Sequence, residues 1–190
     1  MVSKIGFIVN PIAGMGGKVG LKGTDGVLEQ ALKLGAKPVS PDKAIETIKE
    51  FISKFSHKDA IQWFTCSGEM GGEELKKAGI TNIEIIYTPT NDVTSSNDTK
   101  KACMQFLEKK VDLILFCGGD GTARDIFSIV ENKIPILGIP SGVKMHSGIF
   151  GINTSASAKM LHEFIKKGLT IGDAEIMDLD EERYRKGDWN

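Results

Sequence analysis

The chain has 190 residues, which is enough for one ordinary domain with a substantial hydrophobic core. Its 24 basic and 25 acidic residues give a formal net charge of −1, so bulk electrostatics give no reason to expect nucleic-acid binding. Three widely spaced cysteines argue against a disulfide framework, and no apolar run approaches the length of a membrane span. With no signal-peptide layout at the N-terminus, these features predict a cytoplasmic protein that binds neither nucleic acid nor membrane.

The first predicted element is a strand over residues 4–9, a short apolar run that stops at Asn10-Pro11. Six glycines follow within residues 14–26, a segment with too few large apolar side chains to pack. We expect an extended surface loop there, and we expect it to order over a bound phosphate donor. A helical pattern runs from about residue 24 to residue 34.

Strand and helix patterns then alternate along the chain. Ser40-Pro41 is typical of an N-cap followed by proline at the first helical position, and apolar residues at helical spacing continue to Phe55. The later predicted strands are 60–65, 83–87, 111–116 and 134–139, and the later predicted helices are 73–78, 98–110, 123–131 and 156–167. This alternation predicts an α/β fold, an open parallel sheet with helices on both faces.

The end of the chain has a different pattern. Residues 170–179 are strand-like, and the polar stretch that follows has a turn signal at Lys186-Gly187-Asp188. A strand that leads into a turn usually pairs with a second strand. The strand–helix alternation therefore ends near residue 168, and a partner strand is expected beyond the turn.

The most informative stretch is residues 117–122, Cys-Gly-Gly-Asp-Gly-Thr, between the fourth predicted strand and the next helix. Glycine lets the backbone turn sharply and lets a ligand come close. The free N–H groups of the following helix favour a phosphate at this turn. The carboxylate of Asp120 would be repelled by that phosphate unless it serves as a base or holds a cation. The stretch therefore favours phosphoryl-transfer chemistry, with a structural turn capped by an aspartate as the alternative.

Parallel strands all end at one edge of their sheet, and ligands bind in the crevice there. The loop after the first strand holds Asn10 and the glycine run, and the loops after the fourth and fifth strands hold residues 118–122 and 141–147. We expect the three loops to converge on one nucleotide site.

Two familiar phosphate-binding motifs are absent. A P-loop would need glycine at position 12 and a hydroxyl at position 19, where the chain has Ile12 and Val19, and a Gly-x-Gly-x-x-Gly motif would also need glycine at position 19. Lys18 and Lys144 could contact phosphates as point charges, with solvated lysines as the alternative. His146 falls at the same edge, where a capping or exposed histidine is the alternative, and no Cys/His spacing indicates zinc.

Taken together, residues 10–17, 118–125 and 138–147 resemble the predicted ATP- or polyphosphate-dependent NAD kinases of archaea and bacteria, and more distantly the diacylglycerol and sphingosine-type lipid kinases. The similarity extends over essentially all 190 residues. The lipid kinases would show Gly-Thr-x-Asn-Asp after the fifth strand, where residues 142–146 of this chain read Gly-Val-Lys-Met-His.

The resemblance implies that the 2′-hydroxyl of NAD is phosphorylated to give NADP, with ATP or polyphosphate as the donor and Mg²⁺ offsetting the charge. Asp120 would be catalytic, accepting or orienting the proton of that hydroxyl, and Asn10 would fix the glycine loop or contact the nucleotide. The implied phosphate- or nucleotide-binding residues are Asn10, Gly14, Gly16, Gly17, Gly118, Gly119, Gly121, Thr122, Ser141, Gly142 and Lys144. No protein ligand for the metal is expected.

Members of this family continue into a second, mostly β domain, and their substrate lies in the cleft between the two domains. The resemblance therefore implies a Rossmann-like α/β nucleotide-binding domain over residues 1–168, and the start of a truncated second β-rich domain over residues 169–190. The chain is therefore expected to be either a phosphotransferase or a nucleotide-binding module without activity, with a lipid kinase as the third alternative. Its partners would be small-molecule nucleotides. The phosphate donor and the oligomeric state, a homo-oligomer included, stay open.

Overall fold

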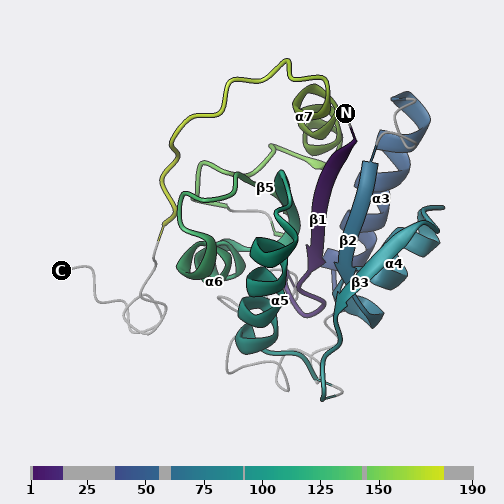
Figure 1. Ribbon diagram of the computed structural model, residues 1–190, viewed down its shortest axis with the longest axis vertical. Coiled ribbons are helices and arrows are strands. Elements are labelled where there is room, and N and C mark those ends of the chain that lie inside the picture. Colours follow the sequence, from purple (N-terminus) through teal and green to yellow (C-terminus); the bar gives the residue numbers. More distant parts are fainter. Residues whose placement is uncertain (1, 15–36, 56–60, 92, 143–144, 178–190) are drawn as a thin grey trace.

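The computed structural model describes residues 2–14, 37–55, 61–91, 93–142 and 145–177 (Figure 1). Its elements are β1 (Ser3–Val9), α3 (Ser40–Lys54), β2 (Ile61–Cys66), the short 3₁₀ helix η2 (Gly68–Met70), α4 (Gly72–Lys77), β3 (Ile83–Tyr87), α5 (Ser96–Lys109), β4 (Leu113–Gly118), α6 (Asp120–Val130), β5 (Ile136–Pro140) and α7 (Thr154–Ile165). The predicted helix at 24–34 and the glycine-rich loop beyond Gly14 lie outside the described residues.

The five strands form one parallel sheet in the order β3-β2-β1-β4-β5, so the predicted open α/β sheet is confirmed. Alternate side chains of the central strands point to opposite faces. Phe7 of β1 belongs to a core with residues of α3, α4 and α7, whereas Ile8 belongs to a core with residues of α5 and α6. Figure 1 shows these two groups of helices on opposite sides of the sheet. All six residues of β4 are buried, as expected for a central strand covered on both faces.

The strand order reverses between β1 and β4. From β1 the chain moves outward through β2 to β3, and it then returns to place β4 on the other side of β1. The helix α6 that follows β4 packs on the face opposite to α3, so the loops diverge here and leave a crevice at the carboxyl ends. Val9 is paired with Cys117, and the Asn10 backbone N–H donates to the Cys117 carbonyl at 2.9 Å. Asn10 and Gly118 therefore lie side by side at this switch point.

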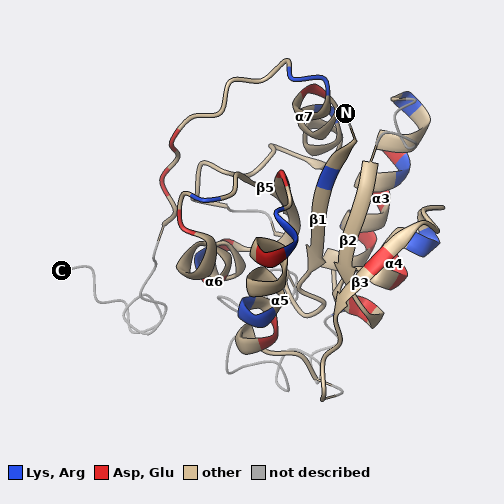
Figure 2. Ribbon diagram, in the orientation of Figure 1, with Lys and Arg blue, Asp and Glu red and all other residues tan. Residues whose placement is uncertain are grey.

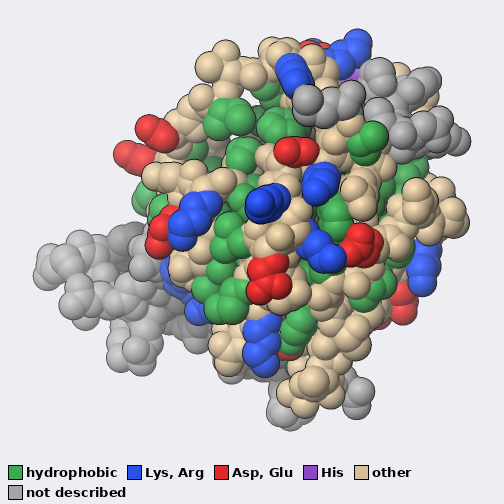
Figure 3. All heavy atoms as spheres, viewed as in Figure 1, with side chains coloured by type: hydrophobic (Ala, Val, Ile, Leu, Met, Phe, Trp, Pro, Cys, Tyr) green, Lys and Arg blue, Asp and Glu red, His purple; other side chains and the backbone are tan. Residues whose placement is uncertain are grey.

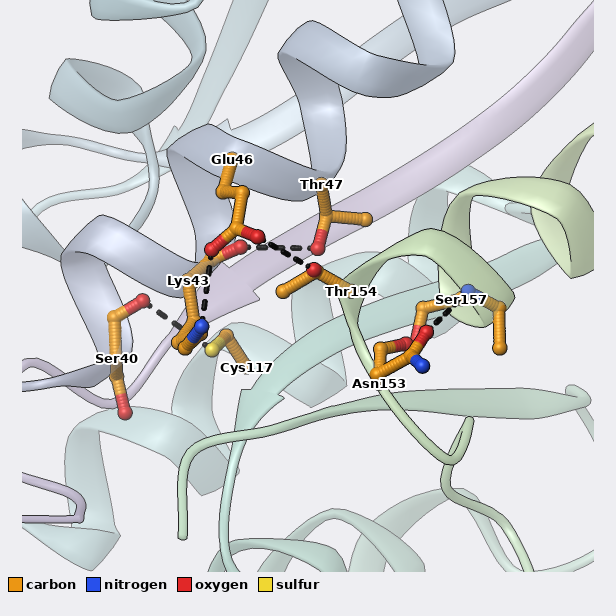
Figure 4. A network of polar contacts seen from close by, with 9 residues as sticks. Ser40, Lys43, Glu46, Thr47, Cys117, Asn153, Thr154 and Ser157 are labelled. Atoms are coloured by element: carbon orange, nitrogen blue, oxygen red, sulfur yellow. Dashed lines mark hydrogen bonds and ion pairs between the residues drawn. The ribbon is translucent and has the colours of Figure 1, made fainter.

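Ser40 does not cap its helix, in contrast to the prediction. It is the first residue of α3, and the capping position falls on Val39, which has no side-chain oxygen. The buried Ser40 hydroxyl instead donates to the Ala13 carbonyl at 3.2 Å. The Ser40 carbonyl accepts a bond from the Cys117 thiol at 3.2 Å (Figure 4). The start of α3 is thus attached to the loop after β1 and to the end of β4.

Polar contacts also hold α7 against α3 (Figure 4). The Thr154 hydroxyl donates to one oxygen of Glu46 at 2.8 Å, and the Lys43 ammonium contacts the other at 2.9 Å. The hydrogen bond from Lys43, followed by that from Thr154, lowers the pKa of Glu46. Asn153 caps α7 by accepting a hydrogen bond from the Ala156 N–H at 2.8 Å. These contacts fix the helix that follows the loop after β5.

Residues 170–177, the described part of the predicted last strand, do not form a strand. The outer edge of β5 is already occupied, because Gly138 pairs with Phe150 in an isolated parallel bridge. The segment 168–177, which we call the C-terminal strap, instead runs from α7 toward α6 (Figure 1). It is attached where the Gly148 N–H donates to the Glu175 carbonyl at 3.0 Å and the Met177 N–H donates to the Ser147 hydroxyl at 3.0 Å. Residues 178–190 lie outside the described part, and the expected second domain stays a prediction.

Acidic and basic side chains are interspersed over the elements and over the face shown in Figures 2 and 3, rather than gathered by sign. Several form ion pairs within or between elements, such as Lys77 with Glu73 at 3.1 Å and Lys109 with Glu84 at 2.7 Å. Of the helices that the structure describes, none has the length and apolar composition needed to cross a membrane.

Glu74 of α4 is a carboxylic acid inside this fold. Its exposed fraction is 0%, and neither carboxylate oxygen has a hydrogen-bond partner within the described part of the chain. Loss of hydration on burial raises the pKa of Glu74. Its charge also acts on the thiol of Cys117, so the acid lies close to the end of β4.

We predict that Glu74 makes the protein less stable as the pH rises. A carboxyl whose pKa is higher in the folded state gives stability that is complete below its unfolded pKa and is lost as the pH rises through its folded pKa. Glu74→Gln removes this dependence, so the melting temperature of the variant relative to wild type should increase between pH 4 and pH 8. Glu73→Gln, at a half-exposed neighbour, is the control. A difference in melting temperature between wild type and Glu74→Gln that stays constant over this pH range would contradict the prediction.

Candidate functional site

The loops that leave the carboxyl ends of β1, β4 and β5 meet at one place. The Asn10 side-chain amide donates to the Thr122 hydroxyl at 2.9 Å, which joins the loop after β1 to α6. The Ser141 backbone N–H donates to the Gly118 carbonyl at 3.2 Å, which joins the loop after β5 to the end of β4. The predicted convergence of the three loops is therefore present at the switch point of the sheet.

Asn10 fixes the shape of the first loop as well as its position. Its Oδ1 accepts a hydrogen bond from the Ile12 N–H at 3.2 Å, and its carbonyl accepts one from the Ala13 N–H at 3.2 Å. The next residue, Gly14, has a φ of +81°, and a Cβ there would lie 2.2 Å from the Ser141 carbonyl oxygen. Glycine at this position thus lets the first loop pack against the third.

Asp120, Gly121 and Thr122 belong to the first turn of α6, although the sequence pattern places the start of this helix at residue 123. The helix begins at Asp120, with Gly119 as its N-cap. The apolar pattern missed this turn because three of its residues are glycine, aspartate and threonine. The early start places the Asp120 carboxylate at the positive end of the helix dipole. The N–H groups of the first turn have no acceptor within the helix, so they can also bind an anion.

The Asp120 carboxylate is held by the loop after β5. Its Oδ1 accepts hydrogen bonds from the Ser147 N–H at 2.9 Å and from the Ser147 hydroxyl at 2.5 Å. Its Oδ2 accepts one from the His146 N–H at 3.0 Å, and that N–H also lies 3.3 Å from Oδ1. The role of His146 that the structure shows is thus one of its backbone, while its side chain is exposed.

Ser147 is a residue of this site that the sequence reasoning did not single out. It is 5% exposed, and it bridges the Asp120 carboxylate and the C-terminal strap. It lies within residues 138–147, the third of the segments that carry the family resemblance, but no spacing rule marks a serine 27 residues from its partner. The register of β4 and β5, together with the path of the loop after β5, brings the two together.

Ser141 has a buried hydroxyl for which the described residues offer no hydrogen-bond partner. The residue is 3% exposed, and it lies between Gly14 and Gly118. A buried hydroxyl without a partner is costly, so a ligand that supplies one would be favoured at this position. Gly142, the next residue, is exposed.

Gly118 and Gly119 are adjacent but have different surroundings. A Cβ on Gly118 would lie 2.6 Å from the Thr122 side chain, so the packing of α6 on β4 requires glycine there. Among the described residues a Cβ on Gly119 would meet nothing within 4 Å, and its φ of −113° is open to any residue. The described fold therefore leaves open space beside Gly119.

Four of the sequence candidates, Gly16, Gly17, Lys18 and Lys144, lie outside the described residues. The structure brings together the others, which are Asn10, Gly14, Gly118, Gly119, Asp120, Gly121, Thr122, Ser141 and Gly142. Their roles toward a ligand remain predictions.

The thiol nearest to the site is unsuited to nucleophilic chemistry. Cys117 is fully buried, and burial, together with the charge of Glu74, raises its pKa to about 12. Cys66 and Cys103 are also free and buried. Across the described ranges, no group of three His, Cys, Asp or Glu side chains could hold a metal ion.

Comparison with protein families identifies a model that covers most of the chain. The family model described as the ATP-NAD kinase N-terminal domain matches residues 5–169. A comparison with curated proteins gives no match. The matched range includes all described strands except the first two residues of β1, and it includes every residue of the three loops.

We predict that the two neighbouring glycines respond differently to alanine. Gly118→Ala should lower the free energy of unfolding by about 1–3 kcal/mol, as expected when a group is forced into a filled space. Gly119→Ala should lower it less, because its Cβ meets open space among the described residues and only the preference for glycine over alanine at an N-cap is lost. Urea unfolding of the two variants measures the difference. Equal stabilities would show that the contact of Gly118 with Thr122 does not constrain the turn.

Proposed function

The chain belongs to the ATP-NAD kinase family, through the N-terminal domain of that family, and we propose that it transfers a phosphoryl group to the 2′-hydroxyl of NAD, giving NADP. ATP or polyphosphate is the donor. The observation that carries the proposal is the place of Asp120, whose carboxylate lies in the first turn of α6 where the three loops meet. The same edge presents groups suited to phosphate beside it.

The phosphates of the donor bind at the end of β4. Free N–H groups at the start of α6 point toward them, and the open space beside Gly119 lets a phosphate approach the backbone. Packing does not require glycine at this N-cap position, and the missing Cβ leaves room for a ligand beside it. The hydroxyl of Ser141 gains a phosphate oxygen as its hydrogen-bond acceptor. The Thr122 hydroxyl accepts a hydrogen bond from Asn10, so its own proton is free to be donated to a second phosphate oxygen.

Asp120 accepts the proton of the ribose 2′-hydroxyl. As that O–H bond breaks, the oxygen attacks the terminal phosphorus of the donor and a new P–O bond forms. The bond from this phosphorus to its bridging oxygen breaks, and ADP or a shortened polyphosphate leaves. Such transfer depends mainly on positioning and on stabilisation of phosphate charge, so one carboxylate on a rigid helix end is a suitable device.

The family implies a divalent ion such as Mg²⁺, but the described residues offer no group of three ligating side chains to hold one. Mg²⁺ commonly keeps several waters and binds substrate phosphates with one or two carboxylates. No residue of this chain is therefore assigned as its ligand.

The partners under this proposal are small-molecule nucleotides. The interspersed charges on the surface offer no patch of one sign on the face shown in Figure 3, which supports the absence of nucleic acid from the proposal. Three free, buried cysteines support a reducing cytoplasmic setting.

We predict that Asp120→Asn lowers NADP formation by about 10²–10⁴-fold, the range expected for loss of general-base assistance. The folded structure should be kept, because asparagine has nearly the same shape. Asp125→Asn is the matched control, since Asp125 lies on the same helix and pairs with Lys100 at 3.4 Å. A coupled NADP assay with ATP, and separately with polyphosphate, measures both variants. Wild-type rates for a folded Asp120→Asn protein would remove Asp120 from the mechanism.

We also predict that Gly119→Val weakens ATP binding about tenfold or more in a protein that still folds, with only the small loss of stability expected for valine at an N-cap. A Cβ is tolerated at this position among the described residues, and the further methyl groups of valine extend into the space that the phosphate needs. Gly172→Val, in the strap, is the control, because a Cβ there also meets nothing within 4 Å. Titration calorimetry gives the affinities. Binding of ATP without NADP formation by wild type would favour a nucleotide-binding module over an enzyme.

A further inference from the structure

The Ser147 hydroxyl lies between the Asp120 carboxylate and the C-terminal strap. Its Oγ is 2.5 Å from Asp120 Oδ1 and 3.0 Å from the Met177 backbone nitrogen. A backbone N–H can only donate, so the serine oxygen accepts that bond and has its single proton left for the carboxylate. Met177 therefore donates to Ser147, and Ser147 donates to Asp120.

The two oxygens of Asp120 differ in how many donors they already have. Oδ1 accepts from both the hydroxyl and the N–H of Ser147, which fills the two lone-pair directions of a carboxylate oxygen. Oδ2 has one close donor, the His146 N–H at 3.0 Å. A second direction is left on Oδ2, so this is the oxygen that can meet a substrate hydroxyl.

Ser147 is buried, at 5% exposed, so water does not readily replace its hydroxyl as the donor. The strap is bonded to Ser147 through the Met177 N–H, and to the next residue, Gly148, through the Glu175 carbonyl. A carboxylate on a helix end has two side-chain torsions, and the bond from Ser147 restrains both. That restraint matters in phosphoryl transfer, where orientation of the nucleophile contributes much of the rate.

We propose that Ser147 is a positioning residue for Asp120: its hydroxyl, aimed by the Met177 N–H, holds Oδ1 and turns Oδ2 toward the substrate hydroxyl. This inference rests on the proposed role of Asp120. It adds a residue that touches neither substrate nor phosphate, and it gives the strap a part in the site.

The test is a double-mutant cycle of Ser147→Ala and Asp120→Asn in the full chain. Ser147→Ala removes the hydroxyl and keeps the two backbone N–H groups, those of His146 and residue 147, that donate to Asp120. We expect it to lower kcat about tenfold or more and to leave KM for NAD and ATP within about twofold, as for an interaction that acts at the transition state. In the Asp120→Asn background it should lower kcat no further. Ser155→Ala is the matched control, because it removes a serine hydroxyl that donates to another carboxylate, that of Glu50, at 2.6 Å.

A measurement independent of activity completes the test. NMR coupling constants report the χ1 torsion of Asp120, which should occupy one rotamer in wild type and in Ser155→Ala but average over several in Ser147→Ala. Additive losses of kcat in the cycle, or an unchanged Asp120 rotamer in Ser147→Ala, would overturn the inference. Full activity of Asp120→Asn would instead refute the proposed function, so the two failures are distinguishable. Met177→Pro removes the N–H that donates to Ser147 and should also lower kcat. An unchanged kcat would show that the strap has no part in positioning Ser147.

Discussion

The pairing of β1 with β4 is the constraint on which the rest of the site depends. It joins two strands that are more than a hundred residues apart in sequence, and it ends with Val9 beside Cys117. Asn10 and the glycine turn are neighbours only because that register is kept. A shift of one residue would turn every side chain of β1 to the other face and would move Asn10 away from Thr122. The two cores on either side of the sheet make such a shift costly, so burial fixes the geometry of the polar edge.

Much of the fold could be predicted because its strands are short apolar runs between turn residues, and β3 was predicted with its observed bounds, Ile83–Tyr87. The end of β4 and the start of α6 could not be predicted, since glycine and aspartate give no apolar signal. Pro41 after Ser40 predicted that Ser40 caps the helix. In the structure Ser40 is the first helical residue, and its hydroxyl donates to the Ala13 carbonyl instead. The described part of the last predicted strand, residues 170–177, is not a strand, because its backbone is bonded to the loop after β5 at Gly148 and Ser147, which no local pattern records.

The candidate site divides in the same way. The loops at the ends of the strands followed from parallel topology, so Asn10, the glycine turn and Ser141 could be expected together. The partners within the site could not, because a hydrogen bond such as that between Ser147 and Asp120 depends on torsions and on the path of a loop. Nor does a sequence separate Gly118, which packing requires, from Gly119, which it does not.

The burial of Cys117 has a consequence for the chemistry of intact protein. Only a thiolate reacts readily with alkylating reagents, and this thiol is both fully covered and held in its neutral form. Cys66 and Cys103 are covered in the same manner, and burial raises the pKa of each. Alkylation of any of the three therefore has to wait for a local opening of the sheet or its helices. Since Cys117 is the last residue but one of β4, the strand that leads into the glycine turn, its rate of modification reports how often that edge of the sheet opens.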